Sequence, residues 1–451
     1  MEITSQKGKK QKGKIGIRKH LNADVMLKGL HKDFSEVSDC REDPIIPIAD
    51  ALMSGFALFS LKDPSLLAFD DRRKTDSNLG NIYNIGKIPC DSQMRTILDE
   101  VDPEELRKPY TNIFWELQRG KVLERMVFFE GCYLLSLDGT GFFSSKKIFS
   151  DSCLVKESKT TGEKTYYQQM LGAAIVHPDL KEVIPLAPEF IVKQDGQSKN
   201  DCERNAAKRF LIKLKKDHPH LPLIIIEDAL SSNAPHIEEI QKQNLHYILG
   251  VKKGDHSFLF NHVEQARING DTTEFELVDE EDPEKTHRFR FLNQVPLNAS
   301  NKDVLVNFLE YWEITPEKTQ HFSWVTDFVI EKDNAYQLMR GGRARWKIEN
   351  ETFNTLKNQG YHFEHNFGHG KKNLSVVFAM LMMLAFLVDQ TQQLCCPLFR
   401  AAWQKLGSKR ELWERMRALF KDFKFKSMRM LYEALYYGVK FQAPIILYNT
   451  G

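Results

Sequence analysis

Two aspartates stand at positions where their carboxylates could take part in chemistry. Asp138 ends the apolar run YLLSLDG, and Asp228 ends the run LPLIIIED. Both runs have the composition of buried strands. In sheets with crossover connections, ligands bind beyond the carboxyl ends of the strands. The sequence therefore predicts that both carboxylates face a ligand site.

A third acid, Glu349, lies in the predicted helix 343–358, with Arg345 four residues before it. Helical spacing puts Glu349 on the same face as three apolar side chains, Trp346, Phe353 and Leu356. A charge on an apolar face is costly unless it is compensated. The compensating group is either Arg345, in an ordinary ion pair, or a cation that Glu349 shares with the two aspartates.

Three carboxylates that meet would repel one another unless a cation lay among them. Oxygen donors that leave room for water and phosphate suit Mg²⁺ or Mn²⁺. Two such ions, about 3.5–4 Å apart, assist in-line displacement at phosphorus, the reaction that cuts or joins nucleic acid strands. Each acid also has a bland explanation: Asp138 as a turn residue, Asp228 as a helix cap, Glu349 as a surface ion-pair partner.

The elements that must position these acids form a mixed α/β pattern. Two strands, 165–178 and 182–192, are predicted to follow the Asp138 strand as an antiparallel hairpin. A helix (200–217), the Asp228 strand, a second helix (235–243) and a strand (246–252) come next. Consecutive antiparallel strands followed by crossovers predict a mixed sheet covered by helices.

The remaining segments suggest further units of structure. Residues 253–330 alternate aromatic and β-branched residues with charges, which predicts a β-rich insertion, and residues 21–129 read as a helical N-terminal domain. The apolar run Leu374–Val388 has 15 residues, fewer than the roughly 20 that span a bilayer, so we expect a core helix and no membrane contact. A basic helical region is expected from 396 to 451.

Three segments resemble the acid-bearing motifs of DDE-class insertion-sequence transposases: LSLDGTG (135–141), IIIEDAL (224–230) and RARWKIENETFNTLKNQG (343–360). That family has a ribonuclease-H-like catalytic domain, which the resemblance places at 130–252 and 331–395, and some members carry a β-rich insertion. One group has a Tyr, Arg, Glu, Lys signature. Arg345 and Glu349 keep its spacing, while its Tyr would fall on Gly342 and its Lys on Leu356.

The resemblance implies roles for individual residues. Asp138, Asp228 and Glu349 would be the catalytic acids and would hold two Mg²⁺ or Mn²⁺ ions. Arg345 and Lys357, which stands one residue after the signature position, would bind DNA phosphate.

Other side chains are weaker candidates. Some relatives stack a flipped base on a Trp of the insertion, a role open to Trp312 and Trp324, although packing is the more common use of a tryptophan. His362, His365 and His369 resemble a metal cluster without a cysteine, and we expect them in a structural or DNA-facing loop. Cys395 and Cys396 read as packing residues, and Glu227 should point away from Asp228 across its strand.

Charge and composition set limits on the function. The chain has 451 residues, 42% of them hydrophobic, and its seven cysteines show no framework spacing, which argues against a secreted disulfide scaffold. Its net charge of +2 hides basic ends, +6 over 1–20 and +7 over 400–440, around a body of −11. Basic ends suit a polyanion partner, and charge alone is equally consistent with solvated tails or faces. Residues 1–20 are expected to be a disordered tail.

These features predict a DNA transposase that hydrolyses the ends of its mobile element and joins them to target DNA. We expect it to be cytoplasmic and prokaryotic, to associate with the nucleoid when bound, and to form a homodimer when it pairs two DNA ends. Two alternatives stay open: a non-catalytic DNA-binding protein derived from a transposase, and a structure-directed nuclease of the same fold.

Overall fold

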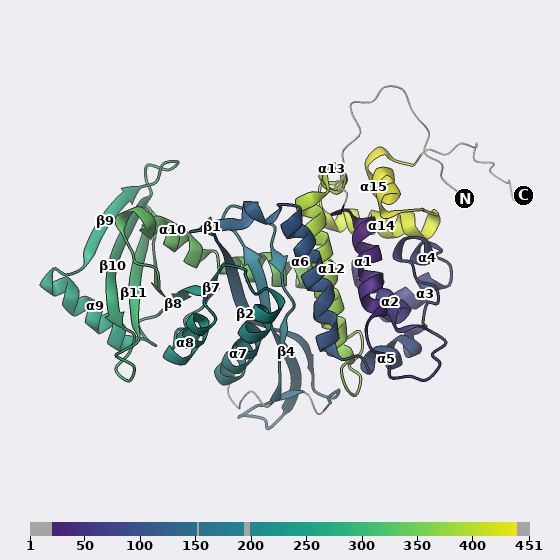
Figure 1. Cartoon of the computed structure of the whole chain (residues 1–451), viewed down its shortest axis with the longest axis horizontal. Helices are drawn as coiled ribbons and strands as arrows, with labels where there is room; N and C mark the ends of the chain where they lie inside the picture. Colours follow the sequence, from purple (N-terminus) through teal and green to yellow (C-terminus); the bar gives the residue numbers. More distant parts are fainter. Residues whose placement is uncertain (1–19, 151–152, 194–198, 440–451) are drawn as a thin grey trace, which may run out of the picture.

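A computed structural model describes residues 20–150, 153–193 and 199–439. The predicted tail at 1–20 lies outside this part of the chain except for its last residue, as does the stretch after 439. The described residues form one mixed sheet of twelve strands, with the order β3-β4-β2-β7-β8-β12-β11-β10-β9 along its main path. Helices cover the sheet, so the chain belongs to the mixed α/β class, as predicted (Figure 1).

Four strands make the centre of the sheet. β2 and β7 are parallel, β7 and β8 are parallel, and β4 runs antiparallel to β2 on its other side. Their order and directions are those of a ribonuclease-H-like mixed sheet. The strands are β2 (Cys132–Ser145), β4 (Lys164–Val176), β7 (Leu223–Glu227) and β8 (His246–Gly250).

Short strands complete this half of the sheet. The predicted partner of β4 exists, but the prolines and turn residues of EVIPLAPEFIV divide it into two pieces that both pair antiparallel with β4. An edge strand on β4 and a short strand on β2 were not predicted. The four are β1 (Val127–Phe129), β3 (Leu154–Glu157), β5 (Ile184–Pro185) and β6 (Glu189–Ile191).

The segment 253–330 extends the same sheet. Its last strand, β12, pairs antiparallel with β8, and the other strands continue outward as a meander. The segment begins with a helix, α9 (Ser257–Asn269). We did not predict this helix from the sequence, because only three of its residues, Leu259, Phe260 and Val263, are buried. The strands are β9 (Thr273–Val278), β10 (Thr286–Pro296), β11 (Leu305–Ile314) and β12 (Thr319–Thr326).

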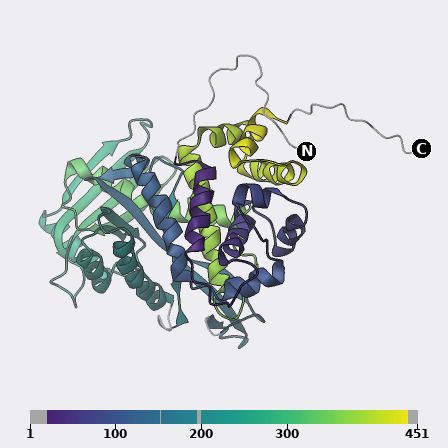
Figure 2. The same cartoon turned by 45° about the vertical axis from the view of Figure 1, so that its right-hand side comes forward.

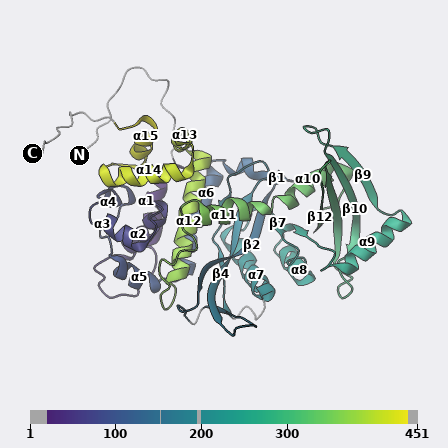
Figure 3. The same ribbon diagram turned by 180° about the vertical axis from the view of Figure 1, so that it is seen from behind.

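Helices cover both faces of the central strands. On one face lie α7 (Lys199–Asp217) and α8 (Ala234–Lys242), and α8 begins where Asn233 accepts a hydrogen bond from the His236 amide. The other face carries α10 (Lys332–Arg343), a π-helical turn η4 (Ile348–Phe353) and α11 (Asn354–Asn358) (Figure 3). The predicted helix 343–358 is therefore broken after Arg343 and contains a π-helical turn.

The N-terminal and C-terminal helices form one helical body around α12 (Leu374–Cys395). Figures 1 and 2 show purple and yellow helices gathered beside it. The N-terminal helices are α1 (Ala23–Ser35), α2 (Ile48–Ser60), α3 (Leu66–Arg73), α4 (Asn78–Tyr83), α5 (Asp91–Asp99) and α6 (Arg107–Arg119), with 3₁₀ turns η1 (Pro103–Leu106) and η2 (Leu123–Met126). The C-terminal helices are α13 (Pro397–Leu406), α14 (Lys409–Asp422) and α15 (Met428–Tyr437).

Helix α12 is the only described helix long and apolar enough to cross a membrane. Of its most apolar window, 94% is buried inside the protein, so it is a core helix, as its sequence predicted.

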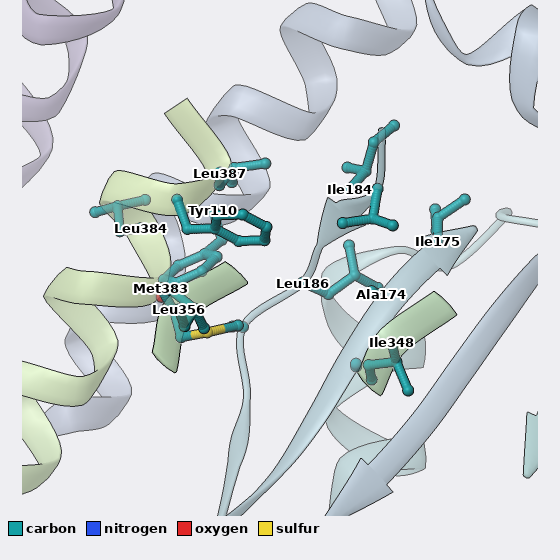
Figure 4. Packing of buried hydrophobic residues seen from close by; sticks show 14 of the residues in the cluster. Tyr110, Ala174, Ile175, Ile184, Leu186, Ile348, Leu356, Met383, Leu384 and Leu387 are labelled. Atoms are coloured by element: carbon teal, nitrogen blue, oxygen red, sulfur yellow. The ribbon is translucent and has the colours of Figure 1, made fainter. Parts of the chain in front are cut away.

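The helical body and the sheet share one hydrophobic core. Figure 4 shows where they meet: Tyr110 of α6 and Leu384 of α12 pack near Ile184 of β5 and Leu356 of α11. The Tyr110 hydroxyl donates a hydrogen bond to the Met380 carbonyl at 2.6 Å, which satisfies the buried phenol. Leu356 belongs to the third acid-bearing segment, so this segment packs against the helical body here.

Candidate active site

Asp138 lies within β2, not at its end. Residues 133–136 of β2 pair with β7, and Asp138 is two residues beyond the last of these pairs. On the other side, β2 continues to Ser145 because the long strand β4 pairs with it past Asp138, which lies opposite Gly172. The prediction that Asp138 ends its strand is wrong. Asp138 is nevertheless at the carboxyl edge of the parallel pair, where a ligand site was expected.

Asp228 directly follows β7 at the same edge. It does not cap the next helix, since Asn233 does so. Its Oδ1 accepts a hydrogen bond from the Leu230 amide at 3.0 Å, and Asp138 Oδ1 accepts one from the Gly139 amide at 2.9 Å. Both aspartates line one pocket.

The electrostatics of Asp138 reflect this neighbourhood. Burial, assisted by the Asp228 charge, raises the pKa of the Asp138 carboxyl to about 6, although the Arg345 guanidinium opposes the shift. Arg345 Nη1 lies 3.7 Å from Asp138 Oδ2, an ion pair but not a hydrogen bond. The attraction is too weak to cancel the repulsion and the loss of hydration.

Arg345 does not pair with Glu349. Its guanidinium faces Asp138 and lies 4.2 Å from the centre of the Trp346 ring. Its backbone carbonyl accepts a hydrogen bond from the Ser136 hydroxyl at 3.0 Å, which fixes the segment before η4 onto β2. The structure therefore brings Arg345 to Asp138.

Glu349 is exposed, so the prediction that it lies on the apolar face of its helix with Phe353 and Leu356, which are both buried, is wrong. A π-helical turn changes the angular spacing of side chains, so Ile348 takes the buried position while Trp346 is 48% exposed. Phe353 still packs on the sheet, where a Cβ at Gly172 would lie 2.7 Å from its ring.

Two positions depart from the Tyr, Arg, Glu, Lys signature, Gly342 and Leu356, and they have different surroundings. At Gly342, a Cβ would lie 2.3 Å from Nε1 of Trp324, so the indole occupies the space that a tyrosine would need. Leu356 is fully buried. Lys357 is half-buried and forms an ion pair with Glu364 at 3.0 Å, so it is engaged within the chain rather than with the aspartates.

Among the described residues, no three Asp, Glu, His or Cys side chains are close enough to hold a metal ion between them. The donors at Asp138 and Asp228 nevertheless suit a divalent cation. They are hard carboxylate oxygens in one pocket, each aspartate commits only Oδ1 to a hydrogen bond with a described group, and their mutual repulsion is what a cation relieves. Glu349 would have to turn inward to join them.

Residues 144–387 match a family model described as a transposase DDE domain, more than half of the chain. The chain belongs to the DDE transposase family. Asp228, Arg345, Glu349 and Lys357 lie within the matched range, and Asp138 lies six residues before it.

One solved structure similar to this transposase is a cryo-EM structure of a piggyBac transposase synaptic complex with hairpin DNA. The TM-score is 0.40 at 10% sequence identity, over 96% of this chain and 89% of that one. No curated protein matches the chain.

The weaker candidates have structural surroundings of their own. Trp324 is 5% exposed and packs in the core, whereas Trp312 stacks on His321 with Arg290 5.1 Å from its ring centre. His369 is buried, with Nε2 3.4 Å from the thiol of Cys153 and 2.9 Å from the Ser150 hydroxyl. Cys395 and Cys396 are both buried.

Two residues of the pocket were not singled out from the sequence. Glu203 of α7 reaches over β2, and His236 of α8 contacts Glu227, which was predicted to point away from Asp228. The sequence signal for Glu203 was Gly139, because a glycine inside a strand often marks a place where another group approaches the backbone closely.

Proposed function

We propose that this transposase hydrolyses DNA at the ends of a mobile element and joins the freed 3′ ends to target DNA, with divalent cations. The observation that carries the proposal is the pairing of Asp138 and Asp228 at one sheet edge, with the Arg345 guanidinium 3.7 Å from Asp138. Negative donors for a cation and a positive donor for phosphate thus lie side by side.

Asp138 and Asp228, together with Glu349, would hold Mg²⁺ or Mn²⁺, two ions in all. Bound there, such ions supply an activated attacking oxygen and stabilise a leaving oxygen. Arg345 binds phosphate oxygens through its planar guanidinium, and Lys357 contributes a point charge once its ion pair with Glu364 opens.

The reaction has two displacements at phosphorus. Water attacks the phosphodiester at the element end, the P–O3′ bond breaks, and the 3′ oxygen leaves as a hydroxyl. That hydroxyl then attacks a target phosphodiester, forming a new P–O bond and releasing the target's own 3′ hydroxyl. Neither step needs an oxidant or a reductant.

The other regions would bind DNA. We assign recognition of the element ends to the helices at 21–129 and DNA contact to the basic C-terminal region 396–451, with a dimer pairing the two ends. These roles would place the protein inside the cell.

A non-catalytic DNA-binding protein is the second candidate. The exposed position of Glu349 favours it, because the described residues contain no ready three-acid metal site. Its basic helices would still bind DNA, but the acids would not cut it.

The test is cleavage and joining of DNA that carries the element's own ends, with Mg²⁺ or Mn²⁺. Wild type is compared with Asp138→Asn, Asp228→Asn and Glu349→Gln, and with Glu351→Gln as a neighbouring acid outside the proposed set. We expect all five proteins to bind the ends, and only wild type and Glu351→Gln to cut and join.

Wild type that binds but never cuts would support the non-catalytic alternative. Cutting without joined product would indicate a nuclease. Cutting that survives Asp138→Asn and Glu349→Gln would place the active site elsewhere.

A further inference from the structure

The π-helical turn η4 holds one residue more than an α-helical turn. The Asn354 amide donates a hydrogen bond to the carbonyl of Glu349, five residues before it. In an α-helix this bond goes four residues back, and each residue adds about 100° of rotation. Side chains after η4 are therefore turned back by about 100° from the positions that an uninterrupted α-helix would give them.

Burial of the side chains follows this longer turn. Ile348 is fully buried, and Phe353, five residues later, is 4% exposed. Two side chains five residues apart on an α-helix point about 140° apart, but across a π-helical turn they share one face. Glu349 and Asn354, which are also five residues apart, are both exposed. The extra residue therefore keeps one apolar face on the sheet and one polar face outside.

Phe353 fixes the register of this segment on the sheet. A Cβ placed on Gly172 of β4 would lie 2.7 Å from the Phe353 ring. Gly172 has ordinary strand backbone, so the close approach of the ring, and not the backbone conformation, requires glycine there. Because Gly172 pairs with Asp138, the ring holds η4 beside the strand position of the first aspartate.

Lys357 is the basic residue whose direction depends on η4. It follows Glu349 by eight residues, which in an uninterrupted α-helix would leave the two side chains about 80° apart. With one residue taken up by the π-helical turn, the other seven make two turns, and Lys357 falls within about 20° of the helix face that carries Glu349. Leu356, which a seven-residue spacing would select, is fully buried.

The present partner of Lys357 can be exchanged for phosphate. The Lys357 ammonium pairs at 3.0 Å with Glu364, whose side chain is 65% exposed. Exposed ion pairs contribute little to stability. A DNA phosphate can therefore replace the Glu364 carboxylate without disturbing η4.

We propose that η4 is a one-residue insertion that positions Lys357 on the helix face of Glu349, where Lys357 contacts the phosphate chain of bound DNA. Phe353 is the positioning residue that holds this register against Gly172. The inference rests on the proposed contact of Lys357 with DNA, and it gives the physical reason why a lysine one residue beyond the signature position can serve.

The experiment changes the length of η4 in the full-length protein and measures its affinity for element-end DNA from about 50 to 200 mM salt. Wild type is compared with a deletion of Asn350 and with an alanine inserted after Asn350. Asn350→Ala is the matched control, because it removes the same exposed side chain without changing the length. All four proteins are also made with Lys357→Ala.

We expect Lys357→Ala to lower the slope of log affinity against log salt by about 0.9 in wild type, in Asn350→Ala and in the deletion. The deletion should melt near the wild-type temperature by circular dichroism, because Ile348 and Phe353, then four residues apart, still share a face. In the insertion variant Lys357 is turned by about 100° from Glu349, so Lys357→Ala should leave the slope unchanged.

Loss of the Lys357 contribution in the deletion, or failure of the deletion to fold, would overturn the inference and leave the proposed function intact. An insertion variant that keeps the full Lys357 contribution would overturn it as well. A slope that Lys357→Ala does not change in wild type would overturn both the contact and its positioning. Wild type that gives the expected slopes but never cuts would sustain the positioning and overturn the proposed hydrolysis.

Discussion

Two regions of the molecule bury charge in opposite ways. In the helical body, the side chain of Lys62 is fully buried, and its ammonium is paired with the Asp389 carboxylate. It also donates to the Ser60 carbonyl at 2.9 Å and lies 4.0 Å from the centre of the Trp413 ring. Asp389 accepts a further hydrogen bond from the Tyr361 hydroxyl.

At the sheet edge, by contrast, Asp138 has an acid, Asp228, for a neighbour, accepts a hydrogen bond from the Gly139 amide, and has its cation, Arg345, no nearer than 3.7 Å. The chain compensates the charge at Lys62 internally and leaves that at Asp138 to be compensated from outside. The difference separates a charge that holds the fold together from one that is kept for a ligand.

The largest effect is expected from breaking the internally compensated pair. Lys62→Met leaves the Asp389 carboxylate buried without its cation, which should lower the free energy of unfolding by about 3–5 kcal/mol. Urea unfolding measures the loss. Lys62→Met combined with Asp389→Leu should lose much less, because no charge is stranded. If Lys62→Met alone were as stable as wild type, the contrast between the two regions would be wrong.

Removing charge at the sheet edge should do the opposite. Because the folded-state pKa of Asp138 is about 6, above its value in the unfolded chain, the ionised carboxylate destabilises the fold at high pH. Asp138→Asn should therefore raise the free energy of unfolding at pH 8 by about 1–2 kcal/mol, allowing for its 30% exposed side chain.

The gain should shrink as the pH falls through 6 and disappear below about pH 4, where the carboxyl is neutral in both states. The same variant should not cut DNA. A lower free energy of unfolding for Asp138→Asn than for wild type at pH 8 would show that the Asp138 carboxylate stabilises the fold.

Arg345→Gln should sharpen the comparison by removing the one nearby cation. Because that guanidinium lowers the pKa of Asp138, its loss should move the acid limb of the cleavage profile to higher pH. Cleavage rates from pH 5 to 8 measure the shift. Arg343→Gln, which loses an ion pair with Glu313 instead, is the control and should leave the limb in place.

The smallest effect on stability is expected on the surface of the helical body. Arg415 of α14 pairs with Glu411 in an exposed contact, so Arg415→Ala should change the free energy of unfolding by less than about 0.5 kcal/mol. If α14 contacts DNA phosphate, the slope of log affinity against log salt should fall by about 0.9 in magnitude. An unchanged slope would remove Arg415 from the DNA contacts.

The sequence was sufficient for the central strands because each is a compact apolar run bounded by turn residues. It failed where a partner decides the structure. β2 continues past Asp138 because β4 pairs with it there, and the face of Glu349 depends on a π-helical turn held by Ile348 and Phe353.

The candidate site was predictable only in part for the same reason. Asp228 follows from a strand end, Asp138 follows from an apolar run although β2 continues past it, and Arg345 follows from a motif. Glu203 and His236 come from helices whose position over the sheet no local pattern records. The roles of all these residues, and of Glu349 and Lys357, stay predictions.

The most direct test of a cation at Asp138 is to change the ligand atom. Thiolate binds Mn²⁺ better than it binds the harder Mg²⁺. Asp138→Cys should therefore fail to cut element ends in Mg²⁺ and regain part of its activity in Mn²⁺, while wild type cuts in both. Cleavage by Asp138→Cys in Mg²⁺ at the wild-type rate, or no recovery in Mn²⁺ by a folded variant that binds DNA, would contradict a metal ion held by this carboxylate.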